Sequence, residues 1–174
     1  MRILAISGSL RADSTNARLL RGAALLAPEG AATFTYYDQQ IATIPAFSPD
    51  LDRDDVTPPV PVAEFRMLLA AAEGILVCCP EYAHGVPGAF KNALDWIVSS
   101  GEFTDKPTAV IMASASGAEM ARAALVPTLK VMGAAVVFEQ SMVMRRNHLG
   151  ADGRISDPAM AQVVTYAVTA LLKA

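Results

Sequence analysis

The sequence contains few of the residues that build metal centres or disulfide frameworks. Its 174 residues include two cysteines and two histidines, and neither type is clustered at the spacing of a zinc site. Cys78 and Cys79 are adjacent, so on a strand they point to opposite faces, and a disulfide between them would be strained. We expect two small buried hydrophobic side chains there and no metal site.

Charge is also scarce. Charged residues make up 18% of the chain, the net charge is −3, and no dense Lys/Arg face is present, which gives a nucleic-acid partner little electrostatic support. The Walker pattern and the G-x-G-x-x-G fingerprint are both absent, which argues against a P-loop NTPase and a standard dinucleotide fold. The apolar start is too short for a signal peptide. The last helical pattern is shorter than the ~20 residues of a membrane span. We expect a cytoplasmic protein without a membrane partner.

Hydrophobic residues, at 53%, are abundant, and the length fits a single domain over residues 1–174. Apolar or β-branched runs that favour strands alternate with helical patterns. The segment 38–61 contains five prolines and is expected to be irregular, as long functional or mobile loops are. The sequence predicts strands at residues 2–7, 32–37, 74–79, 108–113 and 134–138, and helices at residues 17–27, 62–72, 88–99, 118–132 and 158–173.

This alternation is typical of βαβ units, which predicts an α/β three-layer sandwich: a five-stranded parallel sheet covered by helices on both faces. Polar loops follow the first, third and fourth strands. In the flavodoxin-like order 2-1-3-4-5, the first and third strands flank the switch point, where ligands bind. The two most elaborate loops follow those two strands, so we expect the binding site there.

The first loop, Ser7 to Asn16, connects a strand directly to a helix. Such a loop offers backbone N–H groups to an anion. Its side chains add hydroxyls, one amide and the guanidinium of Arg11, with Asp13 as the one acid. The loop is therefore interpreted as a phosphate cradle. Helix capping by the same residue types is the alternative.

The loop after the third strand carries a resemblance. Pro80-Glu81-Tyr82 precedes Pro87-Gly88-x-x-Lys91-Asn92-Ala93-Leu94-Asp95-Trp96, and the first loop contains Gly8-Ser9-x-Arg11-x-x-Ser14-x-Asn16. Together with the Ile44-Pro45 segment and the Gly153-Arg154 turn, these motifs resemble the NADPH-dependent FMN reductase family of quinone, chromate and azo-dye reductases. The resemblance spans essentially the whole chain.

The resemblance implies a flavodoxin-like fold, bound FMN, and NADPH or NADH as cosubstrate. It places the FMN phosphate in the first loop and the flavin ring against the other two loops, largely through backbone groups. Because the flavin supplies the hydride chemistry, no residue is expected to be catalytic with certainty. The implied cofactor-binding residues are Ser9, Arg11, Ser14, Thr15, Asn16, Pro80, Glu81, Tyr82, Ala83, His84, Gly85, Ser114, Ser116 and Gly117.

The sequence departs from the family pattern at two places. The family often has Asn after Glu-Tyr, where this chain has Ala83, so a side-chain amide contact is lost. The family commonly has a Gly-rich turn after the fourth strand, whereas this chain reads Ser114-Ala115-Ser116-Gly117-Ala118 without the Gly pair. The fit of these two turns to the flavin is therefore open at this point.

Several side chains have two interpretations. Tyr82 is either adjacent to the flavin or a packing aromatic. Glu81 is expected to position the loop backbone, with a solvated acid or a subunit ion pair as the alternatives. His84 is either a candidate proton donor or an ordinary loop residue. The Arg145-Arg146 pair is expected to be a solvated turn, with a subunit interface or a nicotinamide-phosphate contact as alternatives.

These observations favour an FMN-dependent NAD(P)H oxidoreductase that works by a ping-pong scheme. Its acceptor would be a quinone, azo compound, metal oxyanion or flavin, and family members are usually homodimers or homotetramers. One alternative is a non-catalytic flavin-binding or redox-sensing module for electron transfer, although −3 is a mild charge for steering a partner. Another is a nucleoside-processing hydrolase or transferase, for which Glu81 would be the nucleophile.

Overall fold

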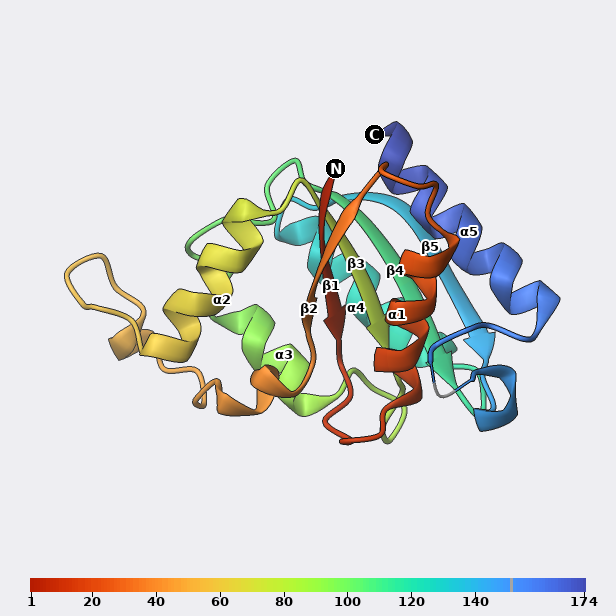
Figure 1. Ribbon diagram of the computed structural model, residues 1–174. Helices are drawn as coiled ribbons and strands as arrows, with labels where there is room; N and C mark the ends of the chain where they lie inside the picture. The colour runs from red at the N-terminus through yellow and green to blue at the C-terminus, as the bar shows by residue number, and fades with distance from the viewer. Residues whose placement is uncertain (151) are drawn as a thin grey trace.

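The computed structural model of the protein describes residues 1–150 and 152–174, without the side chain of Arg146. Five parallel strands form one sheet in the order β2-β1-β3-β4-β5. The predicted flavodoxin-like order is thereby confirmed (Figure 1). The strands are β1 (Arg2–Ser7), β2 (Thr33–Tyr37), β3 (Gly74–Cys79), β4 (Pro107–Ser114) and β5 (Ala135–Val143).

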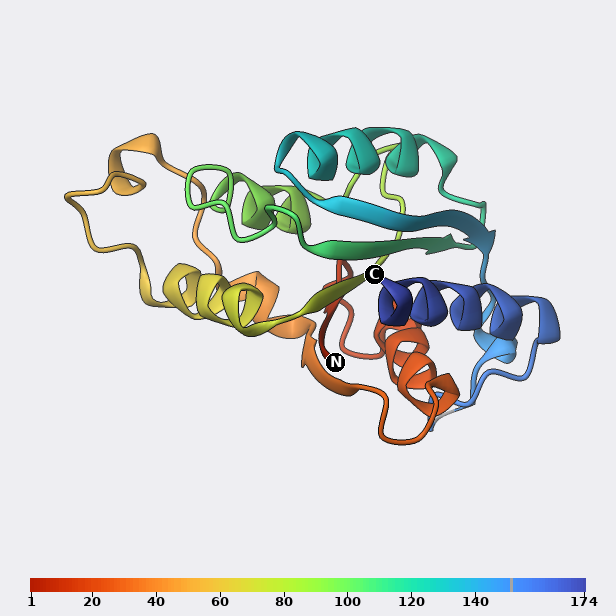
Figure 2. The same cartoon turned by 90° about the horizontal axis from the view of Figure 1, so that it is seen from above.

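Helices cover both faces of the sheet, as Figure 2 shows. One face packs against α1 and α5, and the other packs against α2, α3 and α4. The helices are α1 (Thr15–Leu26), α2 (Val60–Ala71), α3 (Gly88–Asp95), α4 (Glu119–Val131) and α5 (Pro158–Lys173), with short 3-10 helices η1 (Gln39–Thr43), η2 (Pro49–Leu51) and η3 (Arg146–His148).

Strand β3 lies at the centre of the sheet, and all six of its residues are buried. Its continuous apolar sequence suits this position, because a central parallel strand is covered on both faces. Cys78 and Cys79 belong to β3; both are free thiols and fully buried, as expected. Because the strands are parallel, the loops after β1, β3 and β4 meet at one edge of the sheet.

Two elements differ from the sequence prediction by more than two residues at one end. Helix α3 ends at Asp95 and not at residue 99, because the chain tightens into a turn in which the Ile97 N–H donates to the Leu94 carbonyl (2.9 Å). Strand β5 extends to Val143, five residues beyond the predicted end, and pairs with the whole of β4. The longer strand carries the chain toward the same edge as the three loops.

The polar region before α5 is hairpin-like, with a bridge between Leu149 and Ile155. Ala151, within it, lies outside the described residues. No helix in the described part of the chain has the length and apolar character needed to cross a membrane.

Candidate active site

The first loop is held against the central strand by a glycine. The Gly8 N–H donates to the Cys78 carbonyl (3.0 Å), which draws the loop onto β3. A Cβ atom at Gly8 would lie 2.4 Å from the Cys79 sulfur, closer than any real side chain allows. Glycine is therefore required at this position by close packing. The Ser7 hydroxyl accepts from the Ser9 N–H (3.3 Å) and tightens the same turn.

Helix α1 begins inside this loop with a regular cap. The hydroxyl of Ser14 accepts from the Ala17 N–H (3.3 Å), and the first turn of the helix contains no acidic residue. Asp13, the one acid of the loop, forms an ion pair with Arg18. The positive end of the helix dipole is therefore not neutralised by a carboxylate of its first turn.

Asn16 is buried at the start of α1, and its Oδ1 accepts from the Cys78 thiol (3.0 Å). Burial raises the pKa of Cys78 well above its ordinary value, with a smaller contribution from Cys79. The thiol is therefore protonated at neutral pH and available as the donor. This contact fixes the Asn16 side chain between α1 and β3.

The second loop folds back on itself after Pro80. Tyr82 and Gly85 form a two-hydrogen-bond bridge, with N···O distances of 3.0 and 2.9 Å. The two residues between them, Ala83 and His84, have φ angles of 48° and 61°. A two-residue turn with positive φ at both positions is the type I′ geometry, which favours Asn and Gly. Ala83 is therefore in a conformation that the more usual Asn adopts readily.

Glu81 joins the second loop to the third. Its Oε2 accepts from the Ala121 N–H (2.9 Å), in the first turn of α4, and its side chain is 11% exposed. Since α4 has no side-chain cap of its own at Ala118, Glu81 serves as the helix cap from a different loop. Its second oxygen lies 3.5 Å from the His84 Nδ1. This arrangement supports the positioning interpretation of Glu81 and leaves the hydrolase nucleophile without support.

The third loop is closed by Ser114. Its hydroxyl donates to the Gly117 carbonyl (3.0 Å) and accepts from the Ser116 N–H (3.3 Å). Gly117 and Ala118 have φ angles of 111° and 124°, so Ala118 lies in a region that L residues rarely adopt. Ala118 is also buried. The departure seen in the sequence therefore coincides with local backbone strain.

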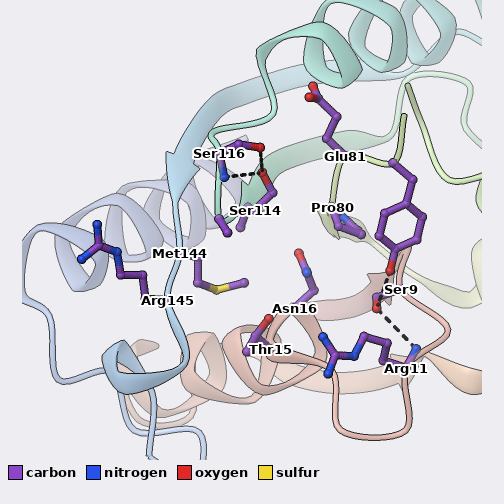
Figure 3. Close-up of a pocket in the computed structure, with 13 residues that line it drawn as sticks. Ser9, Arg11, Thr15, Asn16, Pro80, Glu81, Ser114, Ser116, Met144 and Arg145 are labelled. Atoms are coloured by element: carbon purple, nitrogen blue, oxygen red, sulfur yellow. Dashed lines mark hydrogen bonds between the residues drawn. The ribbon is translucent and has the colours of Figure 1, made fainter. Parts of the chain in front are cut away.

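The three loops surround one cleft of about 410 Å³, a size typical of small-ligand sites (Figure 3). The hydroxyls of Ser9 and Tyr82 lie 3.4 Å apart and link the first loop to the second. Figure 3 shows the Arg11 guanidinium turned toward Thr15. The cleft is lined by Ser9, Arg11, Thr15, Asn16, Pro80, Glu81, Tyr82, Ala113, Ser114, Ala115, Ser116, Met144 and Arg145.

Nine of the residues predicted for the site line this cleft, and five do not. Ser14 acts in the α1 cap, while Gly117 shapes the third loop. The other three, Ala83, His84 and Gly85, directly follow Tyr82 in the second loop. The His84 side chain is 77% exposed. The lining residues are Ser9, Arg11, Thr15, Asn16, Pro80, Glu81, Tyr82, Ser114 and Ser116, and the five outside it are Ser14, Ala83, His84, Gly85 and Gly117.

Four lining residues were not predicted as site residues: Ala113, Ala115, Met144 and Arg145. Ala113 and Ala115 flank Ser114, so their proximity was a signal in the sequence. Met144 and Arg145 reach the cleft because β5 is longer than predicted, and the Met144 N–H donates to the Ser114 carbonyl (2.8 Å). Of the Arg145-Arg146 pair, Arg145 borders the cleft. The Arg146 side chain is not among the parts of the chain that the structure describes.

Helix α3, which follows the second loop, has a structural function. The Asn92 side chain donates to the Pro45 carbonyl (2.9 Å) and accepts from the Phe47 N–H (2.8 Å). The Trp96 indole also donates to the Pro45 carbonyl (2.9 Å). Asn92 and Trp96 therefore hold Pro45 and Phe47, in the middle of the 38–61 segment, next to the end of α3. Lys91 forms an ion pair with Asp95 on the same helix.

No group of three or more His, Cys, Asp or Glu side chains with the geometry of a metal site occurs among the described residues. Two of the charged residues lining the cleft are arginines, Arg11 and Arg145, and the third is Glu81, which caps α4. The donor set therefore suits an anionic organic ligand, with hydroxyls, an amide and a guanidinium around a helix N-terminus.

Comparison with known proteins identifies the family of this chain. Residues 1–148 match the model of the NADPH-dependent FMN reductase family. The chain belongs to that family. The resemblance inferred from the two loop motifs is thereby confirmed, and the FMN and NADPH of the family's description agree with the cofactors that the resemblance implied.

Individual relatives agree with this assignment. An NAD(P)H-dependent FMN reductase from Pseudomonas aeruginosa is 31% identical over 177 residues, which cover 98% of this chain and 93% of that protein. A 2-hydroxy-1,4-benzoquinone reductase from Burkholderia is 38% identical over 96 residues. That match covers 55% of this chain and 49% of the Burkholderia protein, so the chain matches about half of that protein's length.

Among solved structures, FerB from Paracoccus denitrificans, a flavoenzyme NAD(P)H:(acceptor) oxidoreductase, has a TM-score of 0.82. It is 28% identical, and the match covers 99% of this chain and 95% of that one. The agreement across both full lengths confirms the flavodoxin-like fold.

Proposed function

We propose that this chain is a single-domain, FMN-dependent NAD(P)H oxidoreductase with FMN bound across the loops after β1, β3 and β4. The observation that carries the proposal is the cleft itself. A loop rich in neutral donors, at the start of α1, faces the Pro80–Tyr82 segment across it. Membership of an oxidoreductase family supports the same conclusion.

The phosphate end of the ligand would lie at the first loop. Ser9, Thr15 and Asn16 provide polar side chains there, and Arg11 provides a positive charge. The close approach of Gly8 to Cys79 holds the loop backbone against β3. Asp13, the one acid of the loop, is paired with Arg18, so its charge is partly neutralised and repels a bound phosphate less. These features fit a phosphate dianion at a helix N-terminus.

The ring end would lie against the second and third loops. Bound FMN supplies the chemistry, by accepting a hydride from NAD(P)H and passing electrons to a second substrate. The chain orients the ring through Pro80, Tyr82 and the Ser114–Gly117 turn, whose backbone groups are fixed by the hydrogen bonds of each turn. Donors fixed in advance stabilise negative charge without rearranging.

We assign His84 to the turn and not to proton transfer. Its imidazole is exposed, faces Glu81, and is not part of the cleft lining. We assign Glu81 to positioning, because its carboxylate is engaged by the first turn of α4. On this assignment neither His84 nor Glu81 acts as a general acid or base.

The proposed acceptors are small electron-accepting molecules: quinones, azo compounds, metal oxyanions or flavins. Relatives that include a benzoquinone reductase and an NADPH azoreductase support this range. NAD(P)H and acceptor would use the same open face of the cleft in turn. We further propose a cytoplasmic homodimer or homotetramer.

An absorption spectrum of the purified protein, followed by anaerobic addition of NADPH or NADH, tests the proposal. We expect a yellow protein with about one FMN per chain, bleaching by a nicotinamide, and recovery of colour on addition of a quinone. A colourless protein that fails to bind FMN contradicts the proposal. Bound FMN that no nicotinamide reduces favours the electron-transfer module instead.

A further inference from the structure

Two guanidinium groups border the cleft, and they are placed differently. Arg11 lies in the first loop with its guanidinium turned toward Thr15, whereas Arg145 lies on the opposite rim, after β5, with its side chain directed away from the centre of the cleft (Figure 3). FMN carries one phosphate, and the first loop already provides for it. Arg145 therefore has no evident function toward the flavin.

The backbone of Arg145 is held firmly at this rim. The Met144 N–H extends the β4–β5 ladder to Ser114 (2.8 Å), and the Arg145 carbonyl accepts from the His148 N–H (3.1 Å) as η3 begins. The Met144 side chain is buried and forms part of the cleft wall. The fixed backbone on both sides anchors the exposed Arg145 side chain at the rim of the cleft and leaves its guanidinium in contact with solvent.

Three carboxylates of the first loop and of the connection after β5 are engaged by other groups. Among the described residues, Arg145 forms no ion pair. Asp13 pairs with Arg18, Asp152 with Arg154, and the Asp157 side chain caps α5 by accepting from the Met160 N–H (2.8 Å). The rim therefore presents a positive charge that is available to an anionic ligand.

We propose that Arg145 binds the nucleotide phosphates of NAD(P)H. This inference rests on the proposed function and names a residue that binds its reductant. A cleft of about 410 Å³ is of single-ligand size, so when FMN fills it the pyrophosphate and adenosine of NAD(P)H must pass over its rim. A guanidinium directed outward at the rim is suited to bidentate contact with a phosphate there.

The test uses the FMN-loaded protein with Arg145→Gln, Arg145→Lys and, as a matched control, Arg154→Gln. Arg154 is 82% exposed on the same connection but does not line the cleft. The measurements are FMN content, oligomeric state, KM and kcat for NADPH and NADH with a neutral quinone, and the Kd of NADP+ by calorimetry.

We expect Arg145→Gln to raise the KM for NADPH and the Kd for NADP+ about tenfold, the loss of one charge-assisted hydrogen bond. FMN content and kcat should be unchanged, Arg145→Lys should recover part of the affinity, and Arg154→Gln should match the wild type. A larger effect on NADPH than on NADH assigns the contact to the 2′-phosphate, and an equal effect assigns it to the pyrophosphate.

Unchanged constants for both nicotinamides would overturn the inference, as would loss of FMN or a change in oligomeric state in Arg145→Gln. These outcomes are distinct from failure of the proposed function. A wild-type protein that binds no FMN overturns the proposed function before Arg145 is tested, whereas an active FMN enzyme indifferent to Arg145 overturns this inference alone.

Discussion

The loop after β1 and the turns after β3 and β4 border the same cleft, but they are built in different ways. The first loop uses regular devices: a serine cap at Ser14 and a glycine where the backbone packs against β3. The other two turns hold Ala83, His84 and Ala118 at positive φ. For residues other than glycine such conformations are disfavoured by roughly 1–2 kcal/mol each.

The two parts of the site are therefore stabilised by different kinds of interaction. Local sequence preferences support the first loop. The later turns depend on longer-range contacts, such as the Tyr82–Gly85 bridge and the bond from the Ala121 N–H to Glu81. A strained turn persists where its surroundings hold it. Changes in the first loop should therefore be more damaging than changes that relax the later turns.

The largest effect is expected for Gly8→Ala. The added methyl group meets the Cys79 sulfur at 2.4 Å inside a fully buried region, so the loop must move away from β3. We expect a loss of about 2–3 kcal/mol in the free energy of unfolding, as for overpacked cores, together with weaker FMN binding. Urea denaturation with and without FMN measures both.

Gly88→Ala provides the control, because a Cβ atom at Gly88 has no neighbour within 4 Å among the described residues and the position opens α3. It should be neutral or slightly stabilising, since alanine favours helix more than glycine does. Equal effects of the two substitutions would show that the Gly8 contact is not what holds the first loop.

Alkaline pH should destabilise the region beneath the first loop. Burial raises the pKa of both Cys78 and Cys79 in the folded protein, and burial, with Glu64, raises the pKa of Tyr37 to about 12. Groups with a raised folded pKa contribute stability that is complete below their unfolded pKa and is lost as pH rises through the folded value.

The free energy of unfolding should therefore fall above about pH 9, by about 1.4 kcal/mol per pH unit for each buried thiol. Denaturation midpoints between pH 7 and 10 measure the decline, and Cys79→Ala should reduce its slope. A midpoint that is constant over this range would contradict the burial of both thiols.

Glu81→Ala should cost about 1 kcal/mol, the usual contribution of a helix cap, because it leaves the Ala121 N–H without its partner. Glu81→Gln retains an acceptor and should cost less. If catalysis disappears in Glu81→Gln while FMN binding and stability persist, Glu81 has a chemical function and the positioning assignment is wrong.

The smallest effect concerns the strained turns. Ala83→Gly relieves a positive φ but adds flexibility to the unfolded chain, so we expect a change of at most about 0.5 kcal/mol, in the stabilising direction. Ala63→Gly, on the exposed side of α2, should instead destabilise by about 0.5–1 kcal/mol. Thermal denaturation of the two variants compares them. Similar losses in both would show that Ala83 is not strained.

The parts of the structure that follow local rules were predictable. The alternation of apolar strands and helices predicted the sheet and its loops, and the continuous apolar run at residues 74–79 predicted the buried centre. Residue types alone indicated that the first loop is polar, and its function as a phosphate cradle stays a prediction. Since these features depend on neighbours in the sequence, they are visible in it.

The remainder depends on contacts between distant segments. The Glu81 bond to α4 joins residues 40 positions apart, and nothing in either segment signals it. Met144 and Arg145 reach the cleft only because β5 continues beyond its apolar run and follows β4. The clamp on Pro45 by Asn92 and Trp96 is likewise long-range. The departures at Ala83 and Ala118 were visible, but their positive φ angles were not.

The central claim is that the first loop binds the phosphate of FMN across the cleft from the Pro80–Tyr82 segment. The most direct measurement compares the Kd of FMN with that of riboflavin, which lacks the phosphate, by quenching of flavin fluorescence. The account predicts that FMN binds about 100-fold or more tightly, since several charge-assisted hydrogen bonds are lost with riboflavin, and that Arg11→Gln narrows the ratio. Equal affinity for FMN and riboflavin would contradict it.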